Sequence, residues 1–135
     1  MTFFAVIDTN VLVSALLRSD SIPGIIITEC LTGKIIPLLS DAILSEYHEV
    51  LLRPKFQFSH EAVNTILIGI IQRGIFIDSL PTNQIFPDPK DAVFYEVVMQ
   101  ARRYTPSYLI SGNLKHFPSE PFILSPHEML DLLNQ

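Results

Sequence analysis

Continuous apolar runs alternate along this chain with segments in which apolar residues are spaced periodically. The short runs predict strands at 3–7, 35–39, 75–77, 108–110 and 122–124, of which the first is expected to be buried. Between them, apolar residues recur at the spacing of one helical face, as Val11, Leu12, Ala15 and Leu16 do. Strands that alternate with helices predict a central, mainly parallel sheet with helices on both faces. We therefore expect a single α/β domain over residues 1–135, a three-layer α/β/α fold with four or five strands.

Capping residues and helix breakers set the bounds of the predicted helices. The helices are expected to begin after Thr9, at Pro23, after Ser40, after Ser59, at Asp91 and after Ser125. The second ends at Gly33, the third before Pro54, and the fourth at about Gln72, ahead of Gly74. Prolines between residues 81 and 90 predict a loop, and the helix that follows it is expected to run to about Tyr104.

Polar residues follow two of the predicted strands at the point where each strand ends. Asp8 comes directly after the first strand, and the turn Ser111-Gly112-Asn113 follows the fourth. In parallel sheets, functional sites form beyond the carboxyl ends of the strands. Helix capping is the alternative role for Asp8, but Thr9 can already serve as the cap, which favours a functional role for the aspartate.

Helical geometry separates the other candidate acids from those that face water. In the helix after Ser40, successive residues turn by roughly 100°, which places Glu46 at the margin of the buried stripe and Glu49 on the outer face. Asp91 lies at a similar margin of the helix that follows the proline-rich loop. Capping for Asp91 and a turn role for Asp88 stay open as alternatives.

Such a set of acids points to a divalent cation. Three carboxylates brought together would repel and raise one another's pKa values, whereas bound Mg²⁺ or Mn²⁺ would stabilise their ionised forms. Zinc is not favoured, because there is one cysteine and the four histidines are scattered. We expect surface or packing roles for all four, His48, His60, His116 and His127, of which His116 is nearest to the Asn113 turn.

Charge and composition limit the class of partner. The net charge of −5 argues against a simple basic nucleic-acid binder, but not against a metal-dependent nuclease whose acids share one pocket. A local basic track is available from Arg53, Lys55, Lys90, Arg102, Arg103 and Lys115. The mean hydropathy is +0.35 although 17% of residues are charged, which predicts an apolar surface that a partner covers.

The single cysteine and the N-terminal segment bear on the compartment. Cys30 has no partner for an internal disulfide, and its apolar neighbours predict a buried structural thiol. The N-terminus lacks the pattern of a signal peptide, and the longest strongly apolar stretch, 66–71, is too short to span a bilayer. We expect a cytoplasmic protein.

Several short motifs follow one another in a specific order and spacing over nearly the whole chain. They are Asp8-Thr9-Asn10-Val11, Ser45-Glu46-Tyr47 with Leu52-Arg53-Pro54-Lys55-Phe56, Asp88-Pro89-Lys90-Asp91, and Ile110-Ser111-Gly112-Asn113 with Lys115-His116-Phe117. Together they resemble the PIN-domain family, metal-dependent ribonucleases that include the VapC-like toxins of toxin-antitoxin pairs. The resemblance implies a single PIN-like domain.

The resemblance also implies roles for individual residues. Asp8, Glu46 and Asp91 would be the catalytic acids and, with Asn113, the ligands of Mg²⁺ or Mn²⁺. The supporting residues would be Thr9, Asn10, Asp88, Ser111 and Asn113, and Arg53, Lys55 and Lys115 would contribute weakly to RNA binding. Many relatives have an aspartate at the position of Asn113 or of His116, and this chain has neither. That departure predicts a weaker second metal site or reduced activity.

By this resemblance the chain would be an endoribonuclease in which a metal-activated water attacks the RNA phosphodiester in line and a 3′-hydroxyl leaves. It would form a homodimer and act as a toxin whose small antitoxin blocks the cleft. One alternative is a degenerate PIN-like domain that binds RNA or a protein partner without cleavage. Two others, a haloacid-dehalogenase-type phosphotransferase built on Asp8 and a signalling receiver domain built on Asp78, each lack an acid that their motif needs.

Overall fold

Five parallel strands form one sheet in the computed structural model, which describes residues 1–135. The strands are β1 (Phe3–Ile7), β2 (Ile35–Leu39), β3 (Ile75–Phe76), β4 (Ser107–Ile110) and β5 (Ile123–Leu124). They lie in the order β3-β2-β1-β4-β5, and every neighbouring pair is parallel. All five predicted strands are therefore found, with bounds that differ from the prediction by at most one residue.

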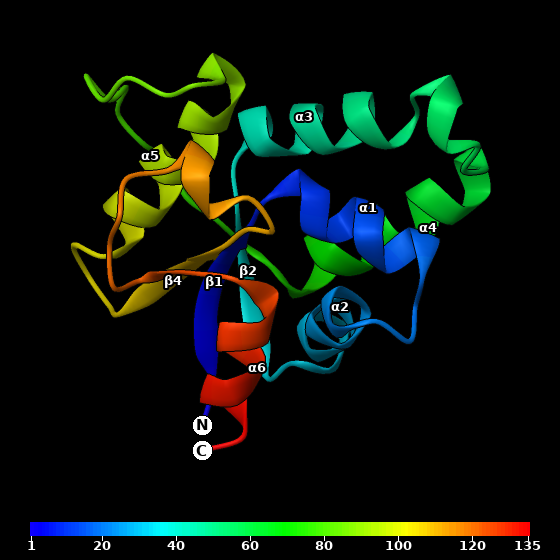
Figure 1. Cartoon of the computed structure of the whole chain (residues 1–135), viewed down its shortest axis with the longest axis horizontal. Coiled ribbons are helices and arrows are strands. Elements are labelled where there is room, and N and C mark those ends of the chain that lie inside the picture. Colours follow the sequence, from blue (N-terminus) through cyan, green and yellow to red (C-terminus); the bar gives the residue numbers. More distant parts are fainter.

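Helices cover both faces of this sheet, and one helix lies across an end of it (Figure 1). They are α1 (Thr9–Leu17), α2 (Ile22–Thr32), α3 (Asp41–Leu51), α4 (His60–Arg73), α5 (Ala92–Ala101) and α6 (Pro126–Leu133). Three 3-10 turns accompany them: η1 (Pro54–Phe56), η2 (Pro89–Asp91) and η3 (Leu114–His116). Helix α5 packs on β1 and β4, α2 and α4 pack on β2, and α6 packs on α2. Figure 1 shows α3 lying across the end of the sheet opposite the two termini. The predicted three-layer α/β/α arrangement is confirmed.

The central strand β1 positions the first candidate acid. Its carboxyl end is almost completely buried, because β2 and β4 flank it within the sheet and helices such as α5 cover its side chains. Ile7 is in register with Ile110 of β4, so the next residues, Asp8 and Ser111, leave the sheet side by side. The Asp8 backbone N–H donates to the Ile110 carbonyl at 2.9 Å, which extends the pairing to the last residue before the turn.

Serine side chains cap four of the helices. Ser21, Ser40, Ser59 and Ser125 each accept a hydrogen bond from the backbone N–H three residues further on. The predicted helix ends at Gly33 and Gly74 are also found. Gly33 has a φ of 96°, in the left-handed region that glycine adopts without a steric penalty.

Three predicted helix starts are wrong by one residue: α2 begins at Ile22 and not at Pro23, because Ser21 caps it, and the other two lie at the candidate site. Thr9 is the first helical residue and not the cap, and Asp8 at the cap position makes no capping hydrogen bond. Asp91 closes the turn η2, so α5 begins one residue later than predicted and ends at Ala101. The physical reason is the same in both places: each carboxylate accepts a hydrogen bond from a distant side chain and not from its own helix.

A buried tyrosine joins α3 to the sheet. The Tyr47 hydroxyl donates to the carbonyl of Ile7, and the Tyr47 ring lies 6.1 Å from the ring of Phe94 on α5. Both rings are almost completely buried. Tyr47 thereby fixes α3 against the end of β1 and against α5, the elements that carry or adjoin the candidate acids.

Cys30 lies on α2 with no exposed surface, as predicted, and burial raises the pKa of its thiol to about 12.

No helix by itself has the length and apolar character to cross a bilayer. Only α1 and α2 taken together, bent by 106° at their junction, have the length and composition for it.

Candidate active site

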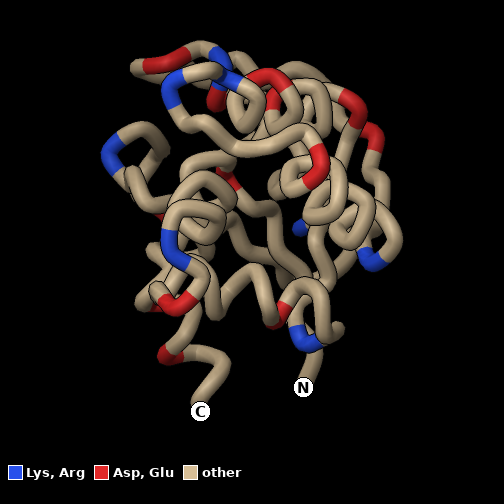
Figure 2. The backbone as a smooth tube through the Cα atoms, turned by 90° about the vertical axis from the view of Figure 1, so that its right-hand side faces the viewer, with Lys and Arg blue, Asp and Glu red and all other residues tan.

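The three candidate acids line one pocket at the carboxyl edge of the sheet. Asp8 follows β1, Glu46 lies on α3, and Asp91 lies at the junction of η2 and α5. The pocket has a volume of about 360 Å³. Every predicted catalytic or supporting residue lines it except Ser111, which lies outside the pocket and hydrogen-bonds to Asp8. Figure 2 shows acidic and basic positions interspersed at this end of the molecule, opposite the termini.

Asp8 is the most deeply buried of the three acids, with 5% of its surface exposed. Ser111 Oγ donates to Asp8 Oδ2 at 2.7 Å. Burial raises the pKa of Asp8 from 3.8 to about 6, against the hydrogen bond from Ser111, which favours the ionised form, and with the negative charge of Asp91 adding to the rise. The Asp8 carboxylate is therefore held in place at an electrostatic cost.

Glu46 projects from α3 next to the buried Tyr47. Its side chain is partly exposed, as its predicted position at the margin of the buried stripe requires. Burial raises the pKa of Glu46, while the nearby cations Lys90 and Arg53 oppose the rise. Glu49, one turn further along, is exposed as predicted. The helix therefore directs one glutamate to the pocket and the other to its rim.

The charge of Asp91 interacts with the charges of both Asp8 and Glu46. Burial raises its pKa most, and the charges of Asp88 and Glu46 raise it further, whereas hydrogen bonding to His116 lowers it. The charge of Asp91 in turn raises the pKa of Asp8. The turn role predicted as the alternative for Asp88 is found, because Asp88 Oδ1 accepts from the Lys90 backbone N–H at 3.0 Å.

The turn after β4 supplies the neutral side of the pocket. His116 Nδ1 lies 3.0 Å from Asp91 Oδ2, and Asn113 Nδ2 lies 3.0 Å from His116 Nε2. The expectation that His116 has only a surface or packing role is thus wrong. His116 lies in the short 3-10 turn η3, and its side chain lines the pocket. The one sign of this contact in the sequence was that His116 lies close to Asn113 along the chain.

Two of the predicted supporting residues, Asn10 and Thr9, differ in what they contact. Asn10 Oδ1 accepts from the Gly112 backbone N–H at 3.1 Å, which ties the start of α1 to the turn after β4. Thr9 is 5% exposed, and its hydroxyl has no hydrogen-bond partner. Thr9, for which the resemblance implies a supporting role, therefore gives the acids no side-chain hydrogen bond in this structure.

Basic side chains occupy the rim of the pocket. Arg53 and Lys90 line it, and Glu49 Oε1 lies 3.5 Å from the Arg53 Nη2 and 3.5 Å from the Lys90 Nζ. Lys55 lies instead over the ring of Phe56, 5.1 Å from its centroid, and Lys115 borders a separate hollow. Of the three residues predicted to bind RNA weakly, only Arg53 is at the pocket, and Lys90 is the cation that accompanies it.

The donor atoms of the pocket fit a hard divalent cation. Carboxylate oxygens with an amide group nearby are the ligands that Mg²⁺ and Mn²⁺ prefer. An orphaned buried hydroxyl such as that of Thr9 is usually satisfied by a water molecule or an ion. In this conformation no three Asp, Glu, His or Cys side chains lie close enough to hold one ion. Ion binding therefore requires the carboxylates to turn toward one another.

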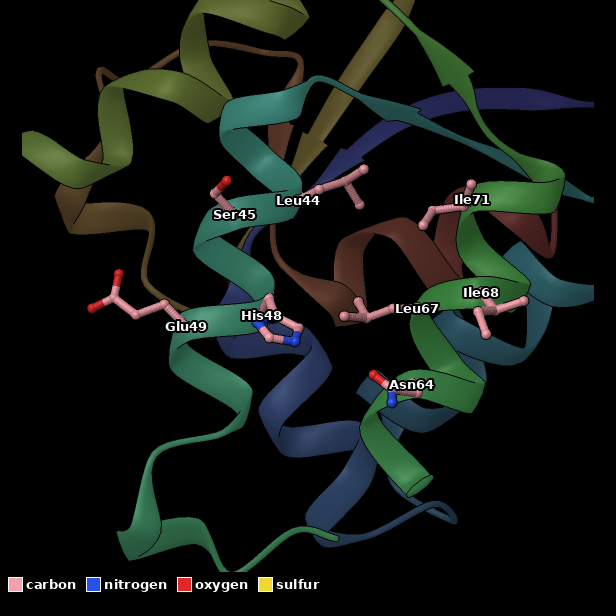
Figure 3. Close-up of a pocket in the computed structure, with 8 residues that line it drawn as sticks. All are labelled: Leu44, Ser45, His48, Glu49, Asn64, Leu67, Ile68 and Ile71. Atoms are coloured by element: carbon pink, nitrogen blue, oxygen red, sulfur yellow. The ribbon is translucent and has the colours of Figure 1, made fainter. Parts of the chain in front are cut away.

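A larger hollow, of about 640 Å³, lies between α3 and α4 and is unlike the acidic pocket. Figure 3 shows Leu44, Leu67 and Ile71 pointing into it from the two helices, while Glu49 points away. Ile68 and Ile71 are 54% and 40% exposed. This groove has an apolar floor and no group of acids, so its size makes it a candidate for protein contact and not for chemistry.

The fold and the pocket together define an α/β protein with an acidic site at the carboxyl edge of a parallel sheet. A family model described as "PIN domain" matches residues 5–115, which is most of the chain. The chain therefore belongs to the PIN-domain family, whose members are generally nucleases that use Mg²⁺ or Mn²⁺. No curated protein and no solved structure shows significant similarity to it.

The two motif-based alternatives receive no support from the structure. A haloacid-dehalogenase-type site would need a second aspartate at position 10, where Asn10 binds the Gly112 backbone. A receiver domain would need Asp78 in the acidic pocket, but Asp78 is exposed in the segment after β3, the strand at the edge of the sheet.

Proposed function

We propose that this protein is a divalent-metal-dependent endoribonuclease and the toxin of a toxin-antitoxin pair. The observation that carries the proposal is the convergence of Asp8, Glu46 and Asp91 on one pocket, each with a raised pKa, in a chain that belongs to a family of nucleases. Carboxylates that are buried together weaken the folded state, and perturbed groups of this kind cluster at functional sites.

The residues of the pocket have complementary roles in this proposal. A divalent cation held by Asp8, Glu46 and Asp91, with the side-chain oxygen of Asn113 as a further donor, would supply Lewis-acid activation of water and offset charge at the scissile phosphate. The Ser111 hydroxyl holds Asp8 in one orientation and favours its ionised form. Asp88 shapes the turn that carries Asp91.

The cations at the rim favour a polyanionic substrate. Arg53 is partly exposed and Lys90 is exposed. Both lie beside the acids and share one weakly bound carboxylate, Glu49. Their 3.5 Å separations from that carboxylate are long for charge-assisted hydrogen bonds, so a phosphate can displace it at little cost. We propose that these two side chains contact RNA phosphates that flank the cleavage point.

Replacing both cations should weaken RNA binding and make it less sensitive to salt. In an Asp8→Asn background that does not cleave, the Arg53→Gln/Lys90→Gln variant should flatten the plot of log affinity against log salt by about 1.4, because each phosphate contact with a single strand contributes about 0.7. Fluorescence anisotropy with a labelled single-stranded RNA measures this slope. Lys115→Gln is the matched control, and an equal flattening there would contradict the assignment of the rim.

Cleavage itself is tested with a glutamate pair. Glu46→Gln keeps the size of the side chain and removes its charge, and should slow RNA cleavage in Mn²⁺ at least about tenfold, because a ligand charge is lost. Glu61→Gln, at the exposed first turn of α4, should cleave like the wild type. Equal products from both variants would mean that the cleavage is not due to this protein. Tight RNA binding without cleavage by the wild type would favour the degenerate alternative.

The toxin role, the homodimer and the cytoplasmic location are part of the same proposal. An acidic chain with an exposed apolar groove between α3 and α4 (Figure 3) suits a small basic amphipathic antitoxin. The same glutamate pair tests the role in cells. Induced expression of the Glu61→Gln variant should arrest bacterial growth and that of Glu46→Gln should not; unimpaired growth with both would contradict it.

A further inference from the structure

A continuous run of hydrogen bonds links the carboxylate of Asp91 to that of Asp8. His116 Nδ1 lies 3.0 Å from Asp91 Oδ2, and Asn113 Nδ2 lies 3.0 Å from His116 Nε2. The Asn113 backbone N–H donates to Ser111 Oγ at 2.9 Å, and that hydroxyl donates to Asp8 Oδ2 at 2.7 Å. We name this run, formed by Ser111, Asn113 and His116, the 111–116 brace.

The chemistry of each group sets the direction of the bonds in the brace. An amide nitrogen only donates, so His116 Nε2 accepts from Asn113, and Nδ1 carries the proton that is donated to Asp91. Ser111 accepts from the backbone and so has its own proton available for Asp8. Both aspartates therefore have one oxygen engaged by the brace, and the other oxygen accepts no side-chain hydrogen bond.

We propose that the 111–116 brace makes this pocket a site for a single divalent cation, with His116 as the residue that positions Asp91. The inference rests on the proposed function, because it concerns the metal of the same pocket. The unpartnered Thr9 hydroxyl, buried in the wall of the pocket, is an independent sign that a ligand belongs there. The brace engages one oxygen of each aspartate, and the other oxygen of each is left to ligate the cation once the carboxylates turn toward one another.

A second cation would need ligands that the pocket does not offer. Paired metal ions lie only about 3.5–4 Å apart, and bridging carboxylates offset their mutual repulsion. Here the brace occupies one oxygen of both Asp8 and Asp91, and the side chains beside them, Asn113 and His116, bring no negative charge. Asp88, the remaining acid of the pocket, is exposed and bonded to its own turn.

The number of bound ions is measured by titrating Mn²⁺ into the full chain, with calorimetry and the electron paramagnetic resonance signal of free Mn²⁺ as readouts. We expect one Mn²⁺ per chain for the wild type and a second for His116→Asp, which adds a carboxylate beside Asp91. Two ions of similar affinity in the wild type would overturn the proposal, as would a folded His116→Asp variant that still binds one. The wild-type measurement stands even if a variant does not fold.

Further substitutions at position 116 test positioning. Asparagine places an amide nitrogen near the place of the histidine Nδ1, so His116→Asn can keep the bond to Asp91, whereas His116→Ala loses it. Loss of such a supporting bond weakens metal binding about tenfold or more, and we expect this for alanine, with asparagine restoring most of the affinity. His127→Ala, which removes an exposed histidine of α6, is the control. Wild-type Mn²⁺ affinity in a folded His116→Ala variant would overturn the positioning role.

RNA cleavage by the same preparations separates this inference from the proposed function. One bound Mn²⁺ with cleavage supports both. Two bound Mn²⁺ with cleavage would overturn the single-cation site and leave the nuclease function standing. Neither binding nor cleavage by the wild type would overturn the proposed function, and the inference with it.

Discussion

Replacing Asp8 with asparagine is expected to abolish RNA cleavage and, at the same time, to stabilise the metal-free protein at neutral pH. Cleavage should fall at least about 100-fold, because the most buried acid of the site loses the charge that holds the cation. Stability should rise because that charge is costly in the folded protein. Asparagine is nearly isosteric, and its side-chain oxygen can still accept the hydrogen bond from Ser111.

The pH dependence of the gain follows from the raised pKa of Asp8. The folded protein binds the Asp8 proton more tightly than the unfolded chain, since the pKa rises from 3.8 to about 6. The free energy of unfolding therefore falls as the pH increases from about 4 to about 6, and the loss reaches at most about 3 kcal/mol. Asp8→Asn lacks this loss. Urea unfolding should show the two proteins alike at about pH 4 and the variant more stable at about pH 7.5.

Two comparisons make this prediction specific to the site. Asp78→Asn removes an exposed aspartate outside the pocket and should change neither cleavage nor stability. Millimolar Mn²⁺ should raise the melting temperature of the wild type more than that of Asp8→Asn, because the ion stabilises only a protein that binds it. Two results would contradict the role assigned to Asp8 as a buried, metal-binding carboxylate. One is an Asp8→Asn variant that is less stable than the wild type at about pH 7.5, and the other is an equal rise of both melting temperatures in Mn²⁺.

The fold was predictable because local signals agree with the tertiary structure. The strands β1, β2 and β5 are continuous apolar runs, and serines at the starts of α3, α4 and α6 cap the helices that the pattern predicts. The bounds of β1 and β2 agree with the prediction. Both strands lie inside the sheet and contain no polar residue that would make their ends ambiguous in the sequence.

The site was predictable where one element decides a side chain's direction. Glu46 and Glu49 sit on a regular helix, so their angles around its axis separate pocket from rim. Sequence reasoning failed where tertiary contacts decide. Asp91 is the last residue of the turn η2 and bonds to His116, 25 residues away, and nothing in the helical pattern predicts that contact.

The same limit applies to two lysines of the predicted RNA-binding set that lie outside the pocket. Lys55 follows a proline in the short turn η1, where its ammonium lies over the neighbouring Phe56 ring, and Lys115 lies in η3 and borders a separate hollow. Short turns of this kind have no period from which a direction can be derived. Their orientation depends on the local backbone, which the sequence pattern leaves open.

Tyr47 connects the stability of the core to the geometry of the site. Its hydroxyl donates to the carbonyl of Ile7, the residue before Asp8. Glu46 directly precedes Tyr47 in the chain. Burial raises the pKa of Tyr47 well above its ordinary value, so the hydroxyl stays a donor at any working pH. One buried bond thus sets the position of α3, and with it Glu46, relative to the strand that carries Asp8.

Removing that hydroxyl is expected to weaken both folding and cleavage. Tyr47→Phe keeps the ring beside Phe94 and deprives a buried carbonyl of its donor, which should lower the free energy of unfolding by about 1–3 kcal/mol. Cleavage at a temperature where the variant is folded should also fall, because α3 is no longer tied to β1 and small displacements of catalytic groups are costly. Urea unfolding and initial cleavage rates measure the two effects. Tyr95→Phe removes a hydroxyl from a second buried tyrosine that has no such bond, and a loss of stability as large as that of Tyr47→Phe would show that the Ile7 contact is not the cause.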